Sequence, residues 1–208
     1  KNMLLMKKTG NFLRKQDVFL IVFYFVISML VMPEHTFHMF CYMMIFWMFN
    51  LLNDSDLMRD LKNYQIYLIP DSPLKKLVSV ILPTLFKISI VVAAALVFAG
   101  VFTRMSAAEI ISWLVMVLGY VMIFVSGTVL SVRLLGSRTN AYVENLLRMV
   151  IIVAAAVPSG AAAVVLFIFM RDLVLVTALV SAVTFLMNIA VSVLIVISCQ
   201  GMMNGKEL

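Results

Sequence analysis

"RDLKNYQIYLIPDSPLKKL", residues 59–77, is the longest polar stretch of the chain, and strongly apolar segments flank it on both sides. Of the 208 residues, 64% are hydrophobic and only 12% are charged. Soluble domains have about 45 to 50% apolar residues. The composition therefore predicts an integral membrane protein in which this stretch lies outside the lipid.

Six apolar windows follow one another along the chain, at residues 18–32, 37–52, 84–102, 110–132, 149–170 and 173–199. A hydrocarbon core of about 30 Å needs about 20 helical residues, so the first two windows are short. The strands of a membrane barrel would alternate with period two over about ten residues, and these windows do not. The predicted fold class is all-α, a polytopic membrane unit over residues 17–208 with six transmembrane helices.

Lys and Arg are distributed unequally between alternate connections, which orients membrane proteins. With a cytoplasmic N-terminus, thirteen of the 16 basic residues face the cytoplasm and only Arg104 and Arg171 face outward, while Lys87 lies near the inner boundary. The inner set is Lys1, Lys7, Lys8, Arg14, Lys15, Arg59, Lys62, Lys75, Lys76, Arg133, Arg138, Arg148 and Lys206. We therefore expect both termini to be cytoplasmic. The formal charge of +6 follows the same pattern and does not predict a nucleic-acid partner.

Residues 1–16 combine five basic residues with apolar ones such as Leu4, Leu5 and Phe12. Such a segment can lie as an amphipathic helix at the anionic inner leaflet. The alternative is an ordinary positive flank that only orients the first span. Because the chain begins with Lys1 rather than methionine, we expect a trimmed or internal start and a longer natural chain.

The connection over residues 53–83 is the one sizeable cytoplasmic loop that we expect. It opens with "NDSDLMRDL", in which Asn53 or Asp54 can cap a short helix, and acids suit the positive end of its dipole. A calcium loop starting at Asp54 is excluded, because Arg59 stands where glycine is needed and Gln65 where glutamate is needed.

A second helix is expected to start beyond Pro70, with Asp71 or Ser72 as its cap and Pro73 in its first turn. Its apolar residues recur at helical spacing, and Lys75 and Lys76 are expected on the opposite side. We expect this helix to lie on the inner surface and to bend at Pro83 into the third span. The apolar residues are Leu74, Leu77, Val78, Ile81 and Leu82.

Two motifs in the loop over residues 53–83 resemble those of a known family. The acidic "NDSDLMRDL" followed by "IYLIPDSPLKKL" before the third span resembles the cytoplasmic coupling loop of exporter-type ABC permeases, most closely the bacterial ABC exporters with a six-span membrane unit. The resemblance covers the topology of the whole chain and the motifs of about 25 residues. It implies that residues 54–73 dock in a groove of a separate ATPase. The implied coupling residues are Asp54, Asp56, Arg59, Asp60, Tyr67, Pro70 and Asp71.

The same resemblance implies a bacterial cytoplasmic (inner) membrane, a second permease half or a second copy of the chain, and outward transport of an apolar or amphipathic substrate such as a peptide, lipid or drug-like molecule. The sequence contains no G-x-x-x-x-G-K-[ST] motif. We therefore expect no cofactor and no catalytic residue in this chain, with ATP and Mg²⁺ held by the partner ATPase.

Few polar residues fall inside the apolar windows. Asn188 is the deepest of them, and either pairs with a neighbouring helix or lies on the transport path. Pro158 and Gly160 interrupt the fifth window, as a hinge or as a tolerated kink in a close helix contact. His35 and His38 are interpreted as interfacial residues rather than metal ligands, because further ligands are missing nearby.

A second function remains open at this point. The chain can instead be a scaffold subunit that recruits a cytoplasmic partner through the same loop without transporting anything. An ion-coupled transporter is disfavoured, because such proteins carry ionisable residues deep in the membrane and this chain has almost none.

Overall fold

The structure is a computed structural model that describes residues 15–53, 56–61, 71–135, 141–169 and 173–201. Every regular element in these ranges is a helix, and no strand is found among them. The predicted all-α fold class is therefore confirmed.

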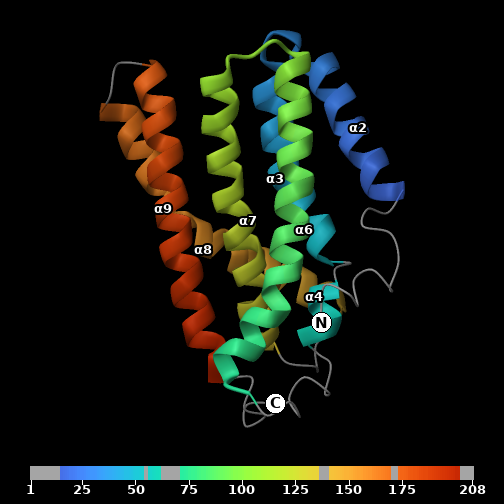
Figure 1. The fold of residues 1–208 in the computed structure, drawn as a ribbon, viewed down its shortest axis with the longest axis vertical. Coiled ribbons are helices and arrows are strands. Elements are labelled where there is room, and N and C mark those ends of the chain that lie inside the picture. The colour runs from blue at the N-terminus through green and yellow to red at the C-terminus, as the bar shows by residue number, and fades with distance from the viewer. Residues whose placement is uncertain (1–14, 54–55, 62–70, 136–140, 170–172, 202–208) are drawn as a thin grey trace.

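The helices follow one another as antiparallel neighbours, and Figure 1 shows that each long helix runs back along the direction of the one before it. The 3-10 helix η1 and the α6–α7 connection lie at one end, which we call the η1 end; α4 and the start of α6 lie at the other, the α4 end. The elements are α2 (Lys15–Val31), η1 (Pro33–His35), α3 (Thr36–Asn53), α4 (Asp56–Leu61), α6 (Pro73–Phe102), α7 (Ala107–Leu135), α8 (Ala141–Phe169) and α9 (Leu173–Cys199).

Among the described residues, four helices contain segments long and apolar enough to cross a membrane: Pro73–Phe102, Ala107–Leu135, Val143–Leu166 and Thr177–Cys199. The apolar segment of α2, Gln16–Val31, is shorter. At 1.5 Å per residue, the 17 residues of α2 and the 18 of α3 span roughly 26 and 27 Å. The chain is thus a multi-pass membrane protein, and the count of six spans stays a prediction.

Residues 73–83 form the first turns of α6 rather than a separate surface helix. The helix is continuous through Pro83, and in Figure 1 its lower turns lean away from its upper part. The predicted change of direction is therefore taken up within one unbroken helix. The helix stays unbroken because the neighbouring turns remain helical around the missing proline donor.

The α6–α7 connection is fixed by two local motifs. Arg104 adopts a left-handed conformation (φ 56°), and the amide of Met105 donates to the carbonyl of Gly100 at 3.0 Å, which closes α6. Ser106 and Glu109 form a capping box at the start of α7, in which Ser106 Oγ donates to Glu109 Oε2 at 2.8 Å and the Glu109 amide donates to Ser106 Oγ at 3.3 Å. These motifs turn the chain sharply between two long helices.

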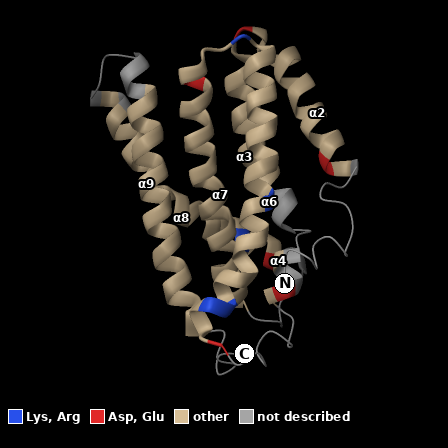
Figure 2. Cartoon of the chain, in the orientation of Figure 1, with Lys and Arg blue, Asp and Glu red and all other residues tan. Residues whose placement is uncertain are grey.

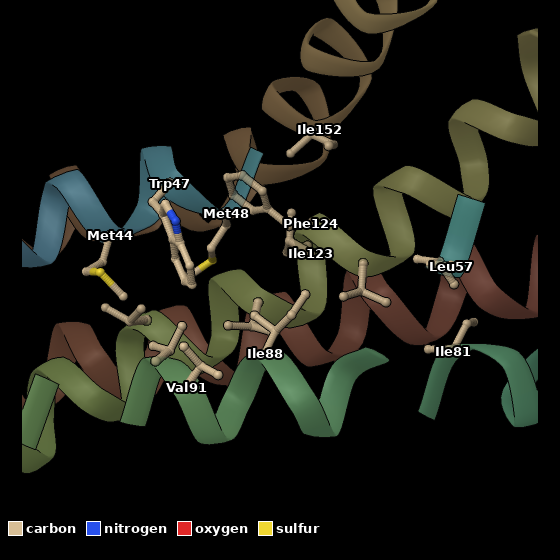
Figure 3. Close-up of a cluster of buried hydrophobic side chains, with 14 of the residues drawn as sticks. Met44, Trp47, Met48, Leu57, Ile81, Ile88, Val91, Ile123, Phe124 and Ile152 are labelled. Carbon is tan, nitrogen blue, oxygen red and sulfur yellow. The ribbon is translucent and has the colours of Figure 1, made fainter. Parts of the chain in front are cut away.

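The core lies around α7, which packs against α3, α6, α8 and α9. Figure 3 shows buried side chains of α3, α6, α7 and α8 in one cluster, among them Met44, Ile88, Phe124 and Ile152. The bulkiest fully buried side chains come from α3, whose buried residues recur at helical spacing. The methionine- and aromatic-rich sequence of α3 is therefore a packed face. The residues of α3 are Phe37, Phe40, Cys41, Met44, Trp47 and Met48.

Large apolar side chains also cover the outside of the molecule. On α2, Phe19 is 67% and Leu30 is 77% exposed, and on α8 Ile168 is 72% exposed. Figure 2 shows that the long helices carry few charged residues. Large apolar side chains exposed on several helices are unusual for a soluble protein and suit contact with lipid.

Candidate functional site

The short helix α4 is anchored to the helix bundle by two leucines. Leu57 and Leu61 are spaced four residues apart, which places them on one helical face, and they are 0% and 1% exposed. α4 packs against α3, α6 and α7. Figure 3 shows Leu57 of α4 beside Ile81 of α6. A six-residue helix is too short to be stable alone, so these contacts hold it in place.

The predicted coupling residues divide into three groups. Asp56, Arg59 and Asp60 belong to α4, and the side chain of Asp60 is partly exposed. Asp71 directly precedes α6. Asp54, Tyr67 and Pro70 lie outside the described residues.

Asp71 organises the start of α6. Its Oδ1 accepts a hydrogen bond from the amide of Ser72 at 2.8 Å and lies 3.6 Å from Nζ of Lys75. Ser72 occupies the N-cap position, without a side-chain capping bond, and Pro73 opens the helix as predicted. The Asp71–Lys75 pair is solvent-exposed, so it contributes little to stability. Both charged side chains are exposed at the α4 end, where another protein could contact them.

The two lysines of this segment do not share a face. The side chain of Lys75 is 75% exposed, whereas Lys76 is 9% exposed and lies on the buried face of α6 with Leu77 and Val80. The prediction that both lysines point away from the packed face is therefore wrong for Lys76. Helical spacing shows which residues share a face, but it does not show whether that face is packed or exposed. In a membrane protein an apolar face can point to lipid. Here Leu74, Val78 and Leu82 are exposed.

A second candidate region is the contact between α7 and α9, which run in parallel. Oγ of Ser126 and Oγ of Ser192 are 3.2 Å apart, and the two residues are separated by 66 positions in the sequence. Gly119 and Phe185 have the same separation, and a Cβ added to Gly119 would lie 3.0 Å from the Cα of Phe185. We call this contact the α7–α9 seam; it is one of the closest helix approaches in the chain.

Asn188 lies in the seam and is completely buried. Neither Nδ2 nor Oδ1 of its amide has a hydrogen-bond partner within the described part of the chain. Its Nδ2 would lie 3.3 Å from a Cβ on Gly119, so the amide fills the space that the glycine leaves. The neighbouring hydroxyls of Ser181 and Thr184 instead donate to carbonyls of their own helix. The sequence left helix packing and a place on the transport path open for Asn188. Here its side chain packs against Gly119 and makes no hydrogen bond across the helices among the described residues.

Pro158 and Gly160 lie within α8 without being buried by the described part of the chain. α8 is continuous from Ala141 to Phe169, and Pro158 is exposed. A Cβ on Gly160 would meet nothing within 4 Å, so the close helix contact expected there is not made with the described residues. The neighbouring Ser159 donates to the carbonyl of Ala156 at 2.9 Å, which supplies one local bond near the proline.

The close contacts come from other glycines. A Cβ on Gly127 would lie 2.8 Å from Ile152 of α8, and one on Gly100 would lie 2.5 Å from Ile110 of α7. These glycine contacts were not predicted from the sequence. Gly119 and Ser126 are seven residues apart and therefore share one face of α7. This spacing of small residues was the sequence feature that could have indicated a close helix contact.

An aromatic cluster occupies the η1 end. The ring of Trp113 lies 5.3 Å from His38 and 5.4 Å from Tyr42, both at steep angles, and His35 lies 6.1 Å from His38. No group of three or more metal-binding side chains occurs among the residues that the structure describes. The histidines thus take part in aromatic packing between α3 and α7.

Comparison with known proteins gives one match. A family model described as "Putative ABC exporter" matches residues 1–207. No curated protein and no solved structure matches the chain. The family match covers nearly the whole sequence, and the apolar helices fit a subunit of a membrane transporter. From this match, in agreement with the resemblance carried by residues 53–83, the chain belongs to the ABC exporter family.

Proposed function

We propose that the chain is the membrane-spanning permease of an ATP-driven exporter. In this proposal α2, α3, α6, α7, α8 and α9 each cross the membrane, and both termini lie in the cytoplasm. Residues 54–73 dock on a separate ABC ATPase, and the chain pairs with a second permease half or a second copy of itself. Membership of the exporter family supports an ATPase partner in general.

The anchoring of α4 is the observation that carries the proposal. A docking helix can transmit force only if it is held firmly by the helices that must move. Leu57 and Leu61 are fully buried, and Leu57 lies beside Ile81 of α6. A push on α4 by a closing ATPase would therefore reach α6 and α7 directly, without first passing through α2.

The charges at the two ends support a cytoplasmic α4 end. Lys75 and Lys76 lie in the first turn of α6 at that end, and Arg133 lies in the last turn of α7. At the η1 end, Arg104 is accompanied by the acids Glu34 and Glu109. An excess of basic residues on the cytoplasmic side is the usual arrangement.

ATP hydrolysis belongs to the partner in this proposal. The ATPase binds ATP and Mg²⁺, while this chain supplies the path for an apolar or amphipathic substrate, a peptide, lipid or drug-like molecule, across a bacterial inner membrane. Exposed apolar faces on α2 and α8 support lateral contact with lipid, from which such a substrate can enter.

Co-purification from native membranes tests the ATPase contact. Asp56→Lys and Arg59→Glu reverse charges on α4 and are expected to reduce the amount of ATPase that co-purifies. Glu109→Lys, a charge reversal at the opposite end, serves as the matched control and should leave it unchanged. A photo-crosslinker at Tyr67 should reach the ATPase; products with lipid alone would contradict the proposal. ATPase binding without any export would favour the scaffold function instead.

A further inference from the structure

The buried face of α9 contains only small or polar residues. The described buried side chains of this helix are Ser181, Thr184, Asn188, Ser192 and Cys199. Their spacing places them on one helix face, which packs on α7. Elsewhere in the bundle large apolar side chains such as Trp47 and Phe40 fill the core. Small residues let helices approach closely. The large apolar side chains of α9 that pack against the core, Val191, Ile195 and Val196, are only partly buried beside this face.

Small or polar residues recur on this face about once per helical turn. Ser192 now lies opposite Ser126, and Asn188 comes four residues earlier on the same face. A movement of α9 by one turn toward its C-terminal end, about 6 Å along its axis, would bring Asn188 opposite Ser126. The same movement would bring Ser181 to Gly119, where Phe185 lies now. The smaller serine suits that close contact.

The alternative register would give the amide of Asn188 a hydrogen-bond partner. Its nitrogen and oxygen are buried without hydrogen-bond partners among the described residues, although a buried amide is normally paired. In the shifted register the Ser126 hydroxyl would be within its reach. We propose that α9 has two registers along α7, one turn apart, in which Ser192 and Asn188 alternate as the partner of Ser126.

Arg133 favours the present register. Its guanidinium donates to the carbonyl of Ser198, in the last turn of α9, where carbonyls lack a partner within the helix. One turn earlier, the carbonyl of Leu194 already accepts a bond from Ser198 Oγ at 2.7 Å. The shift would therefore cost the Arg133 contact and gain the Asn188 contact. Opposing contacts of this kind make a helix pair bistable, and one-turn shifts between packed elements are an established type of transition.

Paired cysteines can report each register. In a background with Cys41→Ala and Cys199→Ala, the pair Ser126→Cys and Ser192→Cys reports the present register. The pair Ser126→Cys and Asn188→Cys reports the shifted one. The pair Ser126→Cys and Val196→Cys, which requires movement in the opposite direction, is the control. Disulfide formation requires Cα atoms about 4.4 to 6.8 Å apart, so an oxidant applied to native membranes distinguishes the three pairs.

The expected result is cross-linking of both the 126–192 and the 126–188 pairs and only background cross-linking of the 126–196 pair. Adding Arg133→Ala should increase the 126–188 product severalfold, because the contact that favours the present register is lost. A 126–188 product no greater than the 126–196 control, with and without Arg133→Ala, would overturn the two registers. The test does not involve the ATPase, so it can succeed where the proposed coupling fails. A rise of the 126–188 product on vanadate trapping with ATP would connect the register to the transport cycle.

Discussion

The Cα of Phe185 lies so close to Gly119 that a Cβ on the glycine would be only 3.0 Å from it. The contact joins two backbones, α7 and α9, and backbone atoms cannot move aside as a flexible side chain can. Close helix approach of this kind is a common source of stability inside membranes, where apolar burial gives little driving force between helices.

Gly119→Ala is expected to destabilise the protein. The added methyl group forces α7 and α9 apart, at a cost of about 1 to 3 kcal/mol for overpacking. Thermal unfolding in detergent should show a lower Tm. Gly160→Ala is the matched control, because it gains the same helix propensity and its Cβ meets nothing within 4 Å. Equal Tm values for the two variants would contradict the close contact at Gly119.

Asn188→Leu is expected to stabilise the resting protein while it impairs transport. The substitution removes a buried amide that has no partner among the described residues, and leaving such a group unsatisfied costs about 1 to 3 kcal/mol. A higher Tm with reduced export would fit an amide that is needed in another state. Ser192→Ala, which removes the Ser126 contact, should instead lower stability by about 0.6 kcal/mol. Unchanged export in Asn188→Leu would argue against a role on the transport path.

Leu57→Ala is expected to loosen α4 from the bundle. Truncation of a fully buried leucine typically costs about 2 to 5 kcal/mol, and in a six-residue helix much of this loss would appear as local release of α4. The ATPase should then hydrolyse ATP without a matching rate of export. Leu82→Ala, at a side chain that is 59% exposed, is the control and should leave the ratio of export to hydrolysis unchanged. An unchanged ratio in Leu57→Ala would show that α4 does not transmit force through this contact.

Much of the fold was predictable from the sequence, because long apolar windows have few alternatives to helices in a membrane. The gaps between the apolar windows at residues 33–36 and 103–109 contain the η1 and α6–α7 connections, and the helix start at Pro73 was predicted correctly. The "SAAE" sequence of residues 106–109 carries a capping box, and its Ser-x-x-Glu spacing is readable from the sequence.

The orientation of helix faces was not predictable in the same way. Water excludes apolar residues from a soluble surface, but lipid does not, so the apolar residues of α6 gave no sign that Lys76 is buried while Leu82 is exposed. The α7–α9 seam was missed for a related reason. Its partners are 66 residues apart in the sequence, and only the register of two packed helices brings Ser126 to Ser192.

The account depends most on the α4 end facing the cytoplasm, and single cysteines test this directly. Lys75→Cys and Arg104→Cys lie at opposite ends of the bundle, both at exposed positions, and each can be made in the background without Cys41 and Cys199. A maleimide that cannot cross membranes should label Arg104→Cys in intact spheroplasts and should label Lys75→Cys only after permeabilisation. Labelling of Lys75→Cys in intact spheroplasts would contradict the account, since no cytoplasmic ATPase could then reach α4.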